Sequence, residues 1–345
     1  MTRKPKGFAK PTMMDVGRLA GVSQSTVSHV VNRTGKIPEE TEQRVRAAIE
    51  ELGYQPNETA RNLRLRRSRT IGLVTDRIAS SPFAGRVLVG AQDYAWENGY
   101  LLLLIDSRQD TRIESAAIDS LLSRQVDGML YAAMAWREVD LPASFAKLPS
   151  LLINAWPSAR RDYPAIVPDE VAGGRLAARA VIEAGHRRIA YIGGPQDDPA
   201  RIEREIGLRE ELASAQLPVD ESWILTGNYQ ISAGYSLTQR LLDADHRPTA
   251  IVCGNDRMAV GAITAALEHG LRVPQDLSIV GYDDQEQFAA EMHPALTTVS
   301  IPHYAMGRTA VERLLDSLHT GRPPLGTTIP GELIRRDSIA APSPV

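Results

Sequence analysis

Five polar side chains recur on one side of a predicted helix near the N-terminus of the chain. They are Gln24, Ser25, Ser28, His29 and Asn32. Their spacing of i, i+1, i+4, i+5 and i+8 places amide, hydroxyl and imidazole groups along one helical face. Such groups donate and accept hydrogen bonds, which is the chemistry needed to recognise base edges in the major groove of DNA. The alternative is the solvated polar face of an ordinary helix.

The residues around this face predict a pair of short helices joined by a tight turn. Thr12 can cap a first helix with its hydroxyl oxygen, and Gly21 can end that helix in a left-handed conformation. Ser23 can then cap the second helix, which contains the polar face. The apolar stripe predicted for the first helix is Val16, Leu19 and Ala20. The apolar side predicted for the second is Val27, Val30 and Val31.

A third amphipathic helix is predicted over residues 39–52, ending at Gly53. Val45, Ala48, Ile49 and Leu52 lie on its apolar side at helical spacing. These side chains could close a small core with the first two helices. Residues 11–54 are therefore predicted to form an all-α, three-helix unit with a helix-turn-helix.

Short motifs follow one another in a specific order through the first 63 residues. They are Asp15-Val16, Leu19-Ala20-Gly21-Val22-Ser23, Thr26-Val27-Ser28, Val31-Asn32, Leu52-Gly53-Tyr54, Pro56-Asn57, and Ala60-Arg61 with Leu63. Together they resemble the lactose-repressor (LacI/GalR) family of bacterial transcription regulators, and so many matches in order are more specific than one short motif. The resemblance implies a DNA-binding head that binds an operator as a dimer.

Within this resemblance, residues 55–69 are expected to form a hinge helix or linker. Pro56 suits a first helical turn, and five arginines surround a short apolar line. Such a helix is marginal alone in water, so it would form only with DNA and a second copy. In the family a leucine of this helix wedges a base step in the minor groove, and Leu63 occupies that position. From the residues alone, a flexible basic tether is the alternative.

The resemblance and the polar face together predict the residues that bind DNA. Gln24, Ser25 and His29 are expected to contact bases, and His29 stands where the family usually has arginine. Phosphate contacts are expected from Thr12, Thr26, Ser28 and Asn32, which carry hydrogen-bonding groups. The hinge residues expected at the minor groove are Ala60, Leu63 and Arg64.

Charge is distributed unevenly along the 345 residues, although the net charge is only −3. Residues 1–69 contain 14 Lys and Arg against 7 Asp and Glu, whereas the remainder contains 25 against 35. A basic head on an acidic body predicts a polyanionic partner for the head alone. Residues 1–10 are basic and are expected to be a disordered arm that touches phosphates.

Composition sets the remaining bounds. At 43% apolar and 23% charged residues the chain is ordinary for a globular protein, and its length predicts two or three units. The basic N-terminus lacks the apolar region of a signal peptide, and no run approaches the roughly 18 apolar residues of a membrane span. Cys253 is the only cysteine, so neither an intramolecular disulfide nor a cysteine metal cluster is expected. A cytoplasmic location is predicted.

From residue 70 onward, short apolar runs alternate with amphipathic helices, which predicts parallel sheets covered by helices. More than eight such units over 275 residues favour two doubly wound lobes in residues 70–345. This body resembles the periplasmic sugar-binding-protein fold of the same regulator family. The matching residues are Ile71-Gly72-Leu73-Val74, Gly185–Gly194, Asn255-Asp256 with Met258-Ala259 and Gly261-Ala262, Ser278–Asp284 and Leu296–Val299.

Ligands of open α/β sheets bind beyond the carboxyl ends of the strands. Trp136, Trp156 and Asn255 follow predicted strands and are therefore candidates for an effector cleft. The family resemblance adds Ser81, Phe83, Asn154, Arg204, Tyr229 and Asp283. Arg204 could clamp vicinal oxygens or a carboxylate, and aromatic rings could cover the C–H faces of a sugar.

Each of these residues also has a structural alternative, as a satisfied polar group or a helix cap. Asp169 and Asp256 are expected to be caps. Ile301 stands where a polar side chain is common in the family, which predicts a more apolar wall of the cleft. Val87, Leu88 and Gln92 are expected at a dimer seam.

The favoured function is a dimeric, ligand-responsive regulator, predicted to be a repressor with a carbohydrate effector and no cofactor or metal. The alternative is a soluble sugar-binding protein, which the basic head argues against. An enzyme is not expected. Residues 75–78 after the first strand are not a phosphate loop, and neither a nucleophile elbow, a zinc motif nor a carboxylate pair is present.

Overall fold

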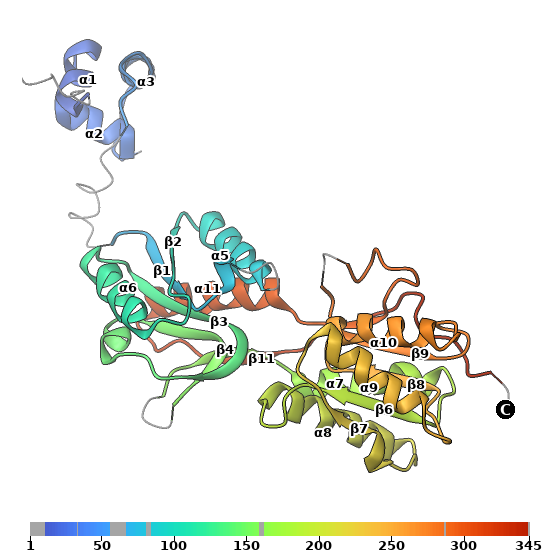
Figure 1. Cartoon of the computed structure of the whole chain (residues 1–345). Helices are drawn as coiled ribbons and strands as arrows, with labels where there is room; N and C mark the ends of the chain where they lie inside the picture. Colours follow the sequence, from blue (N-terminus) through green and yellow to red (C-terminus); the bar gives the residue numbers. More distant parts are fainter. Residues whose placement is uncertain are drawn as a thin grey trace, which may run out of the picture. The chain divides into compact units, whose positions relative to one another are not determined.

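The chain divides into two compact units, residues 1–68 and residues 69–345 (Figure 1). The computed structural model describes residues 11–32, 34–55, 67–80, 84–158, 162–285 and 288–343. Each unit has its own hydrophobic core. We call the first unit the head and the second unit the body.

The head consists of α1 (Met13–Ala20), α2 (Gln24–Asn32) and α3 (Glu39–Leu52). Thr12 caps α1 as predicted, since its Oγ1 accepts from the Asp15 N–H at 3.3 Å while the Asp15 carboxylate accepts from the Thr12 N–H at 3.0 Å. Gly21 and Gly53 end α1 and α3 in the left-handed conformation. The buried core is Val16, Ala20, Val27, Val30, Val45, Ala48 and Tyr54.

One residue predicted for this core is misplaced. Leu19 is 46% exposed, and the buried face of α1 consists of Val16, Gly17 and Ala20. Tyr54, which follows α3, also belongs to the core. The buried face is therefore turned toward Gly17, away from Leu19, and the apolar pattern did not show this because glycine has no apolar side chain.

The body contains two six-stranded sheets, each forming the centre of one lobe. In lobe 1 the strand order is β11-β5-β4-β3-β1-β2, and neighbouring strands pair in parallel throughout the described residues. The strands are β1 (Thr70–Thr75), β2 (Leu101–Asp106), β3 (Gly128–Val139), β4 (Ser150–Pro157), β5 (Ala165–Pro168) and β11 (Thr327–Ile329). Lobe 1 therefore has β2 and β11 as its edges.

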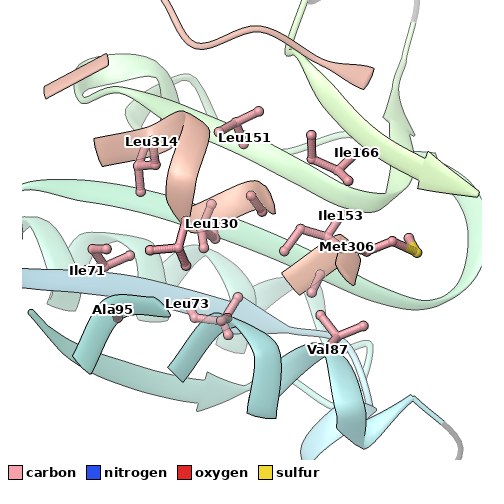
Figure 2. Close-up of a cluster of buried hydrophobic side chains, with 14 of the residues drawn as sticks. Ile71, Leu73, Val87, Ala95, Leu130, Leu151, Ile153, Ile166, Met306 and Leu314 are labelled. Carbon is pink, nitrogen blue, oxygen red and sulfur yellow. The ribbon is translucent and has the colours of Figure 1, made fainter. Parts of the chain in front are cut away.

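Helices cover both faces of the lobe 1 sheet. The helices α5 (Gly85–Glu97) and α11 (His303–Thr320) pack on one face, where Val87, Met306 and Leu314 meet Ile71, Leu130 and Ile153 (Figure 2). On the opposite face lie α6 (Thr111–Ser123) and the 3₁₀ turn η2 (Ala143–Lys147). A further 3₁₀ turn, η1 (Ile78–Ser80), follows β1. The first core is mostly aliphatic, whereas the second also contains the aromatic rings of Tyr131, Phe145 and Tyr163.

Lobe 2 repeats this plan with the order β12-β10-β9-β8-β6-β7, in which only β12 is antiparallel to its neighbour. The strands are β6 (Ile189–Gly193), β7 (Ile224–Thr226), β8 (Ala250–Cys253), β9 (Ser278–Asp283), β10 (Thr298–Ser300) and β12 (Leu333–Ile334). One face packs α7 (Glu170–Glu183) and α8 (Pro199–Ser214), and the other packs α9 (Ile231–Leu242) and α10 (Asp256–Glu268). The 3₁₀ turn η3 (Glu221–Trp223) precedes β7.

The chain passes between the lobes at three described places. It leaves lobe 1 between β5 and α7, returns between β10 and α11, and crosses again between β11 and β12 (Figure 1). The two doubly wound lobes are as predicted, whereas β5, β10, β11 and β12 were not predicted. Strands of two to four residues are too short to show a hydrophobic period.

The crossing of α5 and α11 depends on a close backbone approach at Gly90. A Cβ added there would lie 2.0 Å from the carbonyl oxygen of Tyr304, so something must shift. We expect Gly90→Ala to lower the free energy of unfolding of the body by about 1–3 kcal/mol through overpacking. Thermal unfolding followed by circular dichroism measures this change.

Gly85 in the same helix provides the control. An added Cβ at Gly85 meets nothing within 4 Å, so Gly85→Ala should be neutral or stabilise the body by up to about 1 kcal/mol. Equal losses of stability in the two variants would contradict the close-packing explanation.

Candidate functional site

The polar face of α2 is exposed at the positions predicted to contact bases, Gln24, Ser25 and His29. Ser23 caps the helix as predicted, with its Oγ accepting from the Thr26 N–H at 3.1 Å, and it also shares a 2.7 Å hydrogen bond with the Ser25 hydroxyl. The His29 Nδ1 lies 3.1 Å from the Thr34 hydroxyl, which holds the ring beyond the end of the helix. Within the described residues Gln24 makes no hydrogen bond, so its amide is available to a partner.

The residues predicted to contact phosphates make hydrogen bonds inside the head. The Asn32 amide donates to the carbonyl of Ser28 at 2.7 Å, and the Thr12 hydroxyl donates to Asp15 at 2.6 Å. The Thr26 hydroxyl lies 2.9 Å from that of Ser23. These bonds fix the side chains on the surface of the head. The hinge predictions Ala60, Leu63 and Arg64 lie outside the described residues.

A cavity of about 310 Å³ lies between the two lobes of the body. Lobe 1 contributes Met134, Ala135 and Trp136 from β3 and Asn154 from β4. The pairing of β3 with β4 shifts register between Ala132 and Arg137, so this segment departs from the regular strand where it meets the cavity. Lobe 2 contributes Glu170, Asp198, Ala200, Arg204, Asn228, Tyr229, Gln230, Asn255, Arg257, Asp283 and Gln285, and Ile301 lies at the crossover.

Arg204 is the buried cation of this cavity, with 5% of its surface exposed. Its Nε and Nη2 donate to the two carboxylate oxygens of Glu170 at 2.7 and 2.8 Å, and its Nη1 donates to the carbonyl of Gly254 at 2.6 Å. The guanidinium also stacks on the Tyr282 ring, 3.7 Å from its centroid. Arg204 therefore lies in the cavity, but the side-on clamp predicted for a ligand carboxylate is occupied by Glu170.

Two further carboxyl groups lie close behind Arg204. Asp283 is 7% exposed, accepts from the Gln285 side chain at 2.9 Å, and has an oxygen 3.9 Å from Nη1 of Arg204. Asp256 is fully buried and accepts from the Thr298 hydroxyl at 2.6 Å and the Gln285 N–H at 2.7 Å. Burial raises the pKa of both carboxyl groups, that of Asp256 to about 7.

Asp256 is consequently not the helix cap that the sequence predicts. Asn255 caps α10, with its Oδ1 accepting from the Met258 N–H at 2.9 Å, and its amide nitrogen donates to the carbonyl of Tyr229 at 3.2 Å. Asp169 is the predicted cap of α7 and accepts from the Ala172 N–H at 2.8 Å. Asn255 and Asp256 are adjacent, and both residue types are common helix caps. The residue types alone therefore did not show which of the two caps α10.

Aromatic side chains line the cavity from both lobes. Tyr229 has a positive φ of 62° and donates its hydroxyl to Asp198, the cap of α8, at 2.9 Å. Across the cavity, the rings of Trp136 and Trp156 meet edge to face with centroids 5.1 Å apart. The buried Nε1–H of Trp136 has no acceptor among the described residues, so a ligand could accept from it.

Trp156 does not line the main cavity. It lines a second cavity of about 470 Å³ that shares Trp136 and Asp198 with the first. Asn154 does line the main cavity, and its amide donates to the carbonyls of Ala133 and Met134 at 3.2 and 3.3 Å. The predicted contacts Ser81 and Phe83 lie outside the described residues.

Sequence reasoning missed several lining residues, above all Glu170. The strand-end criterion would have found it, because Glu170 follows β5 by two residues, but that four-residue strand was not recognised. Gln230, Arg257 and Gln285 were also missed. Each lies one or two residues after a predicted residue, and the sequence did not show how far each loop follows the cavity. The apolar wall predicted at Ile301 does line the cavity.

Within the described residues, the structure contains no group of three or more His, Cys, Asp or Glu side chains arranged to hold a metal ion. In the same part of the chain, no helix is long and apolar enough to cross a membrane. Cys253 is buried in β8, as expected for a strand thiol.

Two protein-family descriptions match the chain. Residues 12–57 match bacterial regulatory proteins of the lacI family, and residues 178–339 match a periplasmic binding protein-like domain. The HTH-type transcriptional repressor PurR of Shigella sonnei and that of Escherichia coli are each 36% identical over 333 residues, covering 95% of this chain and 97% of the relative. The chain belongs to the lacI family. That family consists of transcriptional regulators with a DNA-binding head and a ligand-binding body.

Solved structures agree with this lacI-family assignment. The lac repressor dimer bound to operator and the anti-inducer ONPF is 28% identical with a TM-score of 0.78, covering 96% of this chain and all of that one. The transcriptional regulator CelR in complex with cellobiose is 31% identical with a TM-score of 0.66, covering 95% of this chain and 99% of that one. The predicted fold class is thereby confirmed.

The raised pKa of Asp256 gives this lacI-family body a pH-dependent stability. Between the ordinary aspartate pKa of 3.8 and about 7, the unfolded chain releases this proton while the folded chain keeps it, so stability falls as pH rises. Asp256→Asn keeps acceptor and donor positions for Gln285 and Thr298 but does not titrate. We expect the variant to gain stability relative to the parent, by on the order of a few kcal/mol, from pH 4 to pH 7.

Denaturant unfolding at a series of pH values measures that difference. Asp169→Asn is the reference, because asparagine caps a helix as well as aspartate does. Stability curves for the Asp256→Asn and parent chains that run parallel across this pH range would refute the assignment.

Proposed function

We propose that this chain is a repressor that binds a palindromic operator as a homodimer. Its affinity for the operator falls or rises when a carbohydrate occupies the interlobe cavity. The observation that carries the proposal is the union, in one chain, of an exposed hydrogen-bonding face on α2 with an enclosed polar and aromatic cavity in the body. One head recognises only a half-site, so two copies are needed for a palindrome.

The lining of the cavity supports a carbohydrate as the effector. Its volume of about 310 Å³ suits a small ligand, since such sites usually measure about 300–1,000 Å³. Amide groups at Asn228 and Gln230 and the carboxylate of Asp198 can bond hydroxyl groups. The rings of Trp136 and Tyr229 can cover the apolar face of a sugar ring. CelR, a relative of similar fold, has been solved as a complex with cellobiose.

Coupling between the cavity and the head follows from the crossovers. A ligand that contacts both lobes favours the arrangement in which both sets of contacts form, and it shifts the lobes only by its differential affinity. Ile301 lies in one crossover and Glu170 begins the helix after another, so both line the cavity at points where the lobes are joined. The head joins lobe 1 through residues 55–69.

An exposed apolar surface on lobe 1 supports the homodimer. It comprises Val89 and Trp96 of α5 and Leu104 of the edge strand β2, with exposures of 50%, 76% and 38%. Such patches on a globular protein mark interaction sites. Of the three residues predicted at the dimer seam, Val87 is fully buried on the inner side of α5, Leu88 is partly buried and Gln92 is exposed, so the proposed seam uses the outer side of that helix.

Gln24→Ala should separate sequence recognition from general DNA affinity. The probe is a palindromic duplex selected from a random pool by the parent chain. Loss of an amide that bonds a base costs about 1–3 kcal/mol, so specific binding should weaken roughly tenfold to 100-fold while the salt dependence stays unchanged. Fluorescence anisotropy measures both quantities, with and without each member of a carbohydrate panel.

Gln43→Ala is the matched control, since Gln43 is an exposed glutamine on α3 of the same head. It should bind as the parent does. An equal loss in the two variants, or a parent chain that selects no sequence at all, would refute the DNA-recognition role of α2.

Trp96→Asp should dissociate the homodimer. Replacing the exposed aromatic ring of this surface by a charged group should weaken self-association by about 30-fold or more. Because Trp96 is 76% exposed, folding of the protomer should be little affected. Sedimentation equilibrium measures the association constant.

Leu325→Asp changes an equally exposed apolar residue, 69% exposed, between α11 and β11. It should leave the association constant unchanged. A Trp96→Asp chain that remains as dimeric as the Leu325→Asp chain would place the interface elsewhere.

A further inference from the structure

Glu170 is a buried acid in the lining of the cavity. Its carboxylate is 1% exposed and lies against the buried guanidinium of Arg204, which is the buried cation among the described lining residues. We propose that Glu170 bars anionic ligands from the cavity by occupying Arg204, so that the effector is an uncharged molecule rather than a carboxylate or a phosphate ester. This inference rests on the proposed role of the cavity as the effector site.

The first support is geometric. An arginine binds a carboxylate or phosphate most strongly through two parallel N–H groups. In this chain the Nε and Nη2 edge already holds both oxygens of Glu170, and Nη1 donates to the carbonyl of Gly254. The Tyr282 ring covers one face of the guanidinium. Two of the five N–H groups of Arg204 remain, one on each Nη atom, and a ligand that accepts from them lies beside the Glu170 carboxylate and the Gly254 carbonyl.

The second support is electrostatic. An anion entering beside Arg204 would meet the carboxylate of Glu170. The carboxyl group of Asp283 is also near, with one oxygen 3.9 Å from Nη1 of Arg204. Asp198 adds another acid at the wall near Tyr229. Among the lining residues, the acids Glu170 and Asp198 offset the bases Arg204 and Arg257, and burial raises the pKa of Asp283, so the lining has no excess of positive charge to attract an anion. Like charges at these distances disfavour an anion in a site shielded from water.

The third support is that the pair cannot easily open. Both partners are more than nine-tenths buried, so a ligand that displaced Glu170 would leave a buried carboxylate without its counter-charge. Both residues also belong to lobe 2, on α7 and α8, so closure of the lobes need not separate them. The occupied state of Arg204 is therefore expected to persist when an effector binds.

Inorganic phosphate tests the proposal without knowledge of the effector. All four tryptophans, at residues 96, 136, 156 and 223, belong to the body, so tryptophan fluorescence follows its unfolding without signal from the head. The full chain is melted with increasing phosphate, against chloride at matched ionic strength. The parent should show no saturable rise in Tm. Glu170→Gln, which keeps the shape but removes the charge, should bind phosphate at least about tenfold more tightly and so raise Tm.

Glu210→Gln is the matched control. Glu210 pairs with Arg175 across the same two helices, with Nε of Arg175 2.8 Å from the carboxylate, but the pair is half exposed and outside the cavity. This variant should respond to phosphate as the parent does. If Glu170→Gln folds poorly, Glu170→Asp, which retracts the carboxylate, should show a smaller gain in the same direction.

Two results would overturn the proposal. One is saturable binding of phosphate by the parent that Arg204→Lys removes. The other is a Glu170→Gln chain whose response equals that of Glu210→Gln. Operator binding by the same variants is measured separately, so a failure of the proposed regulatory function is distinguishable from a failure of this inference.

Discussion

The body is built around a buried charge that must be neutralised. Arg204 enters the interior from α8, where water cannot solvate it, and an unpaired guanidinium there would be prohibitively unstable. Its partners come from three other elements: Glu170 from α7, the Gly254 carbonyl after β8 and the Tyr282 ring of β9. Satisfying one side chain therefore fixes the ends of four elements at the cavity.

Such neutralisation requires α7 and α8 to approach each other closely. At Gly207, an added Cβ would lie 2.0 Å from the carbonyl oxygen of Val171, and at Gly174 it would lie 2.1 Å from that of Arg204. Glycine thus removes the side chains that would hold the helices apart, and the Glu170 carboxylate reaches the Arg204 fork. Packing and electrostatics are linked here, because the ion pair forms only where the backbone contact is tight.

How far the sequence predicts this protein depends on how local each feature is. The capping of α1 by Thr12, the glycine ends of α1 and α3 and the polar face of α2 are decided within a few residues, and the structure agrees with them. The strand-end rule placed Trp136 and Asn255 at the cavity, because it depends only on recognising strands, and the family resemblance added Asn154, Arg204, Tyr229 and Asp283. Features that need distant partners were harder to predict.

The failures have a common physical origin. Glu170 was missed because the preceding strand, β5, was not recognised. The four residues of β5 form a strand by pairing with β4 and β11, and their own pattern does not show it. Asp256 was taken for a cap because the groups that donate hydrogen bonds to it are far away in the sequence. Thr298 and Gln285 lie 42 and 29 residues further along the chain. Val87 was placed at a surface because the position of α11 over α5 is not visible in either helix alone.

The same distinction explains how a conserved architecture could accommodate different ligands. The sheets and helix crossings depend on aliphatic packing and glycine contacts that leave the cavity lining free to vary. A single acid at the first residue of α7 is enough to change the electrostatic character of the cavity, because it acts on a cation that the fold already buries. In the proposed effector role, specificity therefore depends less on which residues line the cavity than on which of them are already bound to one another.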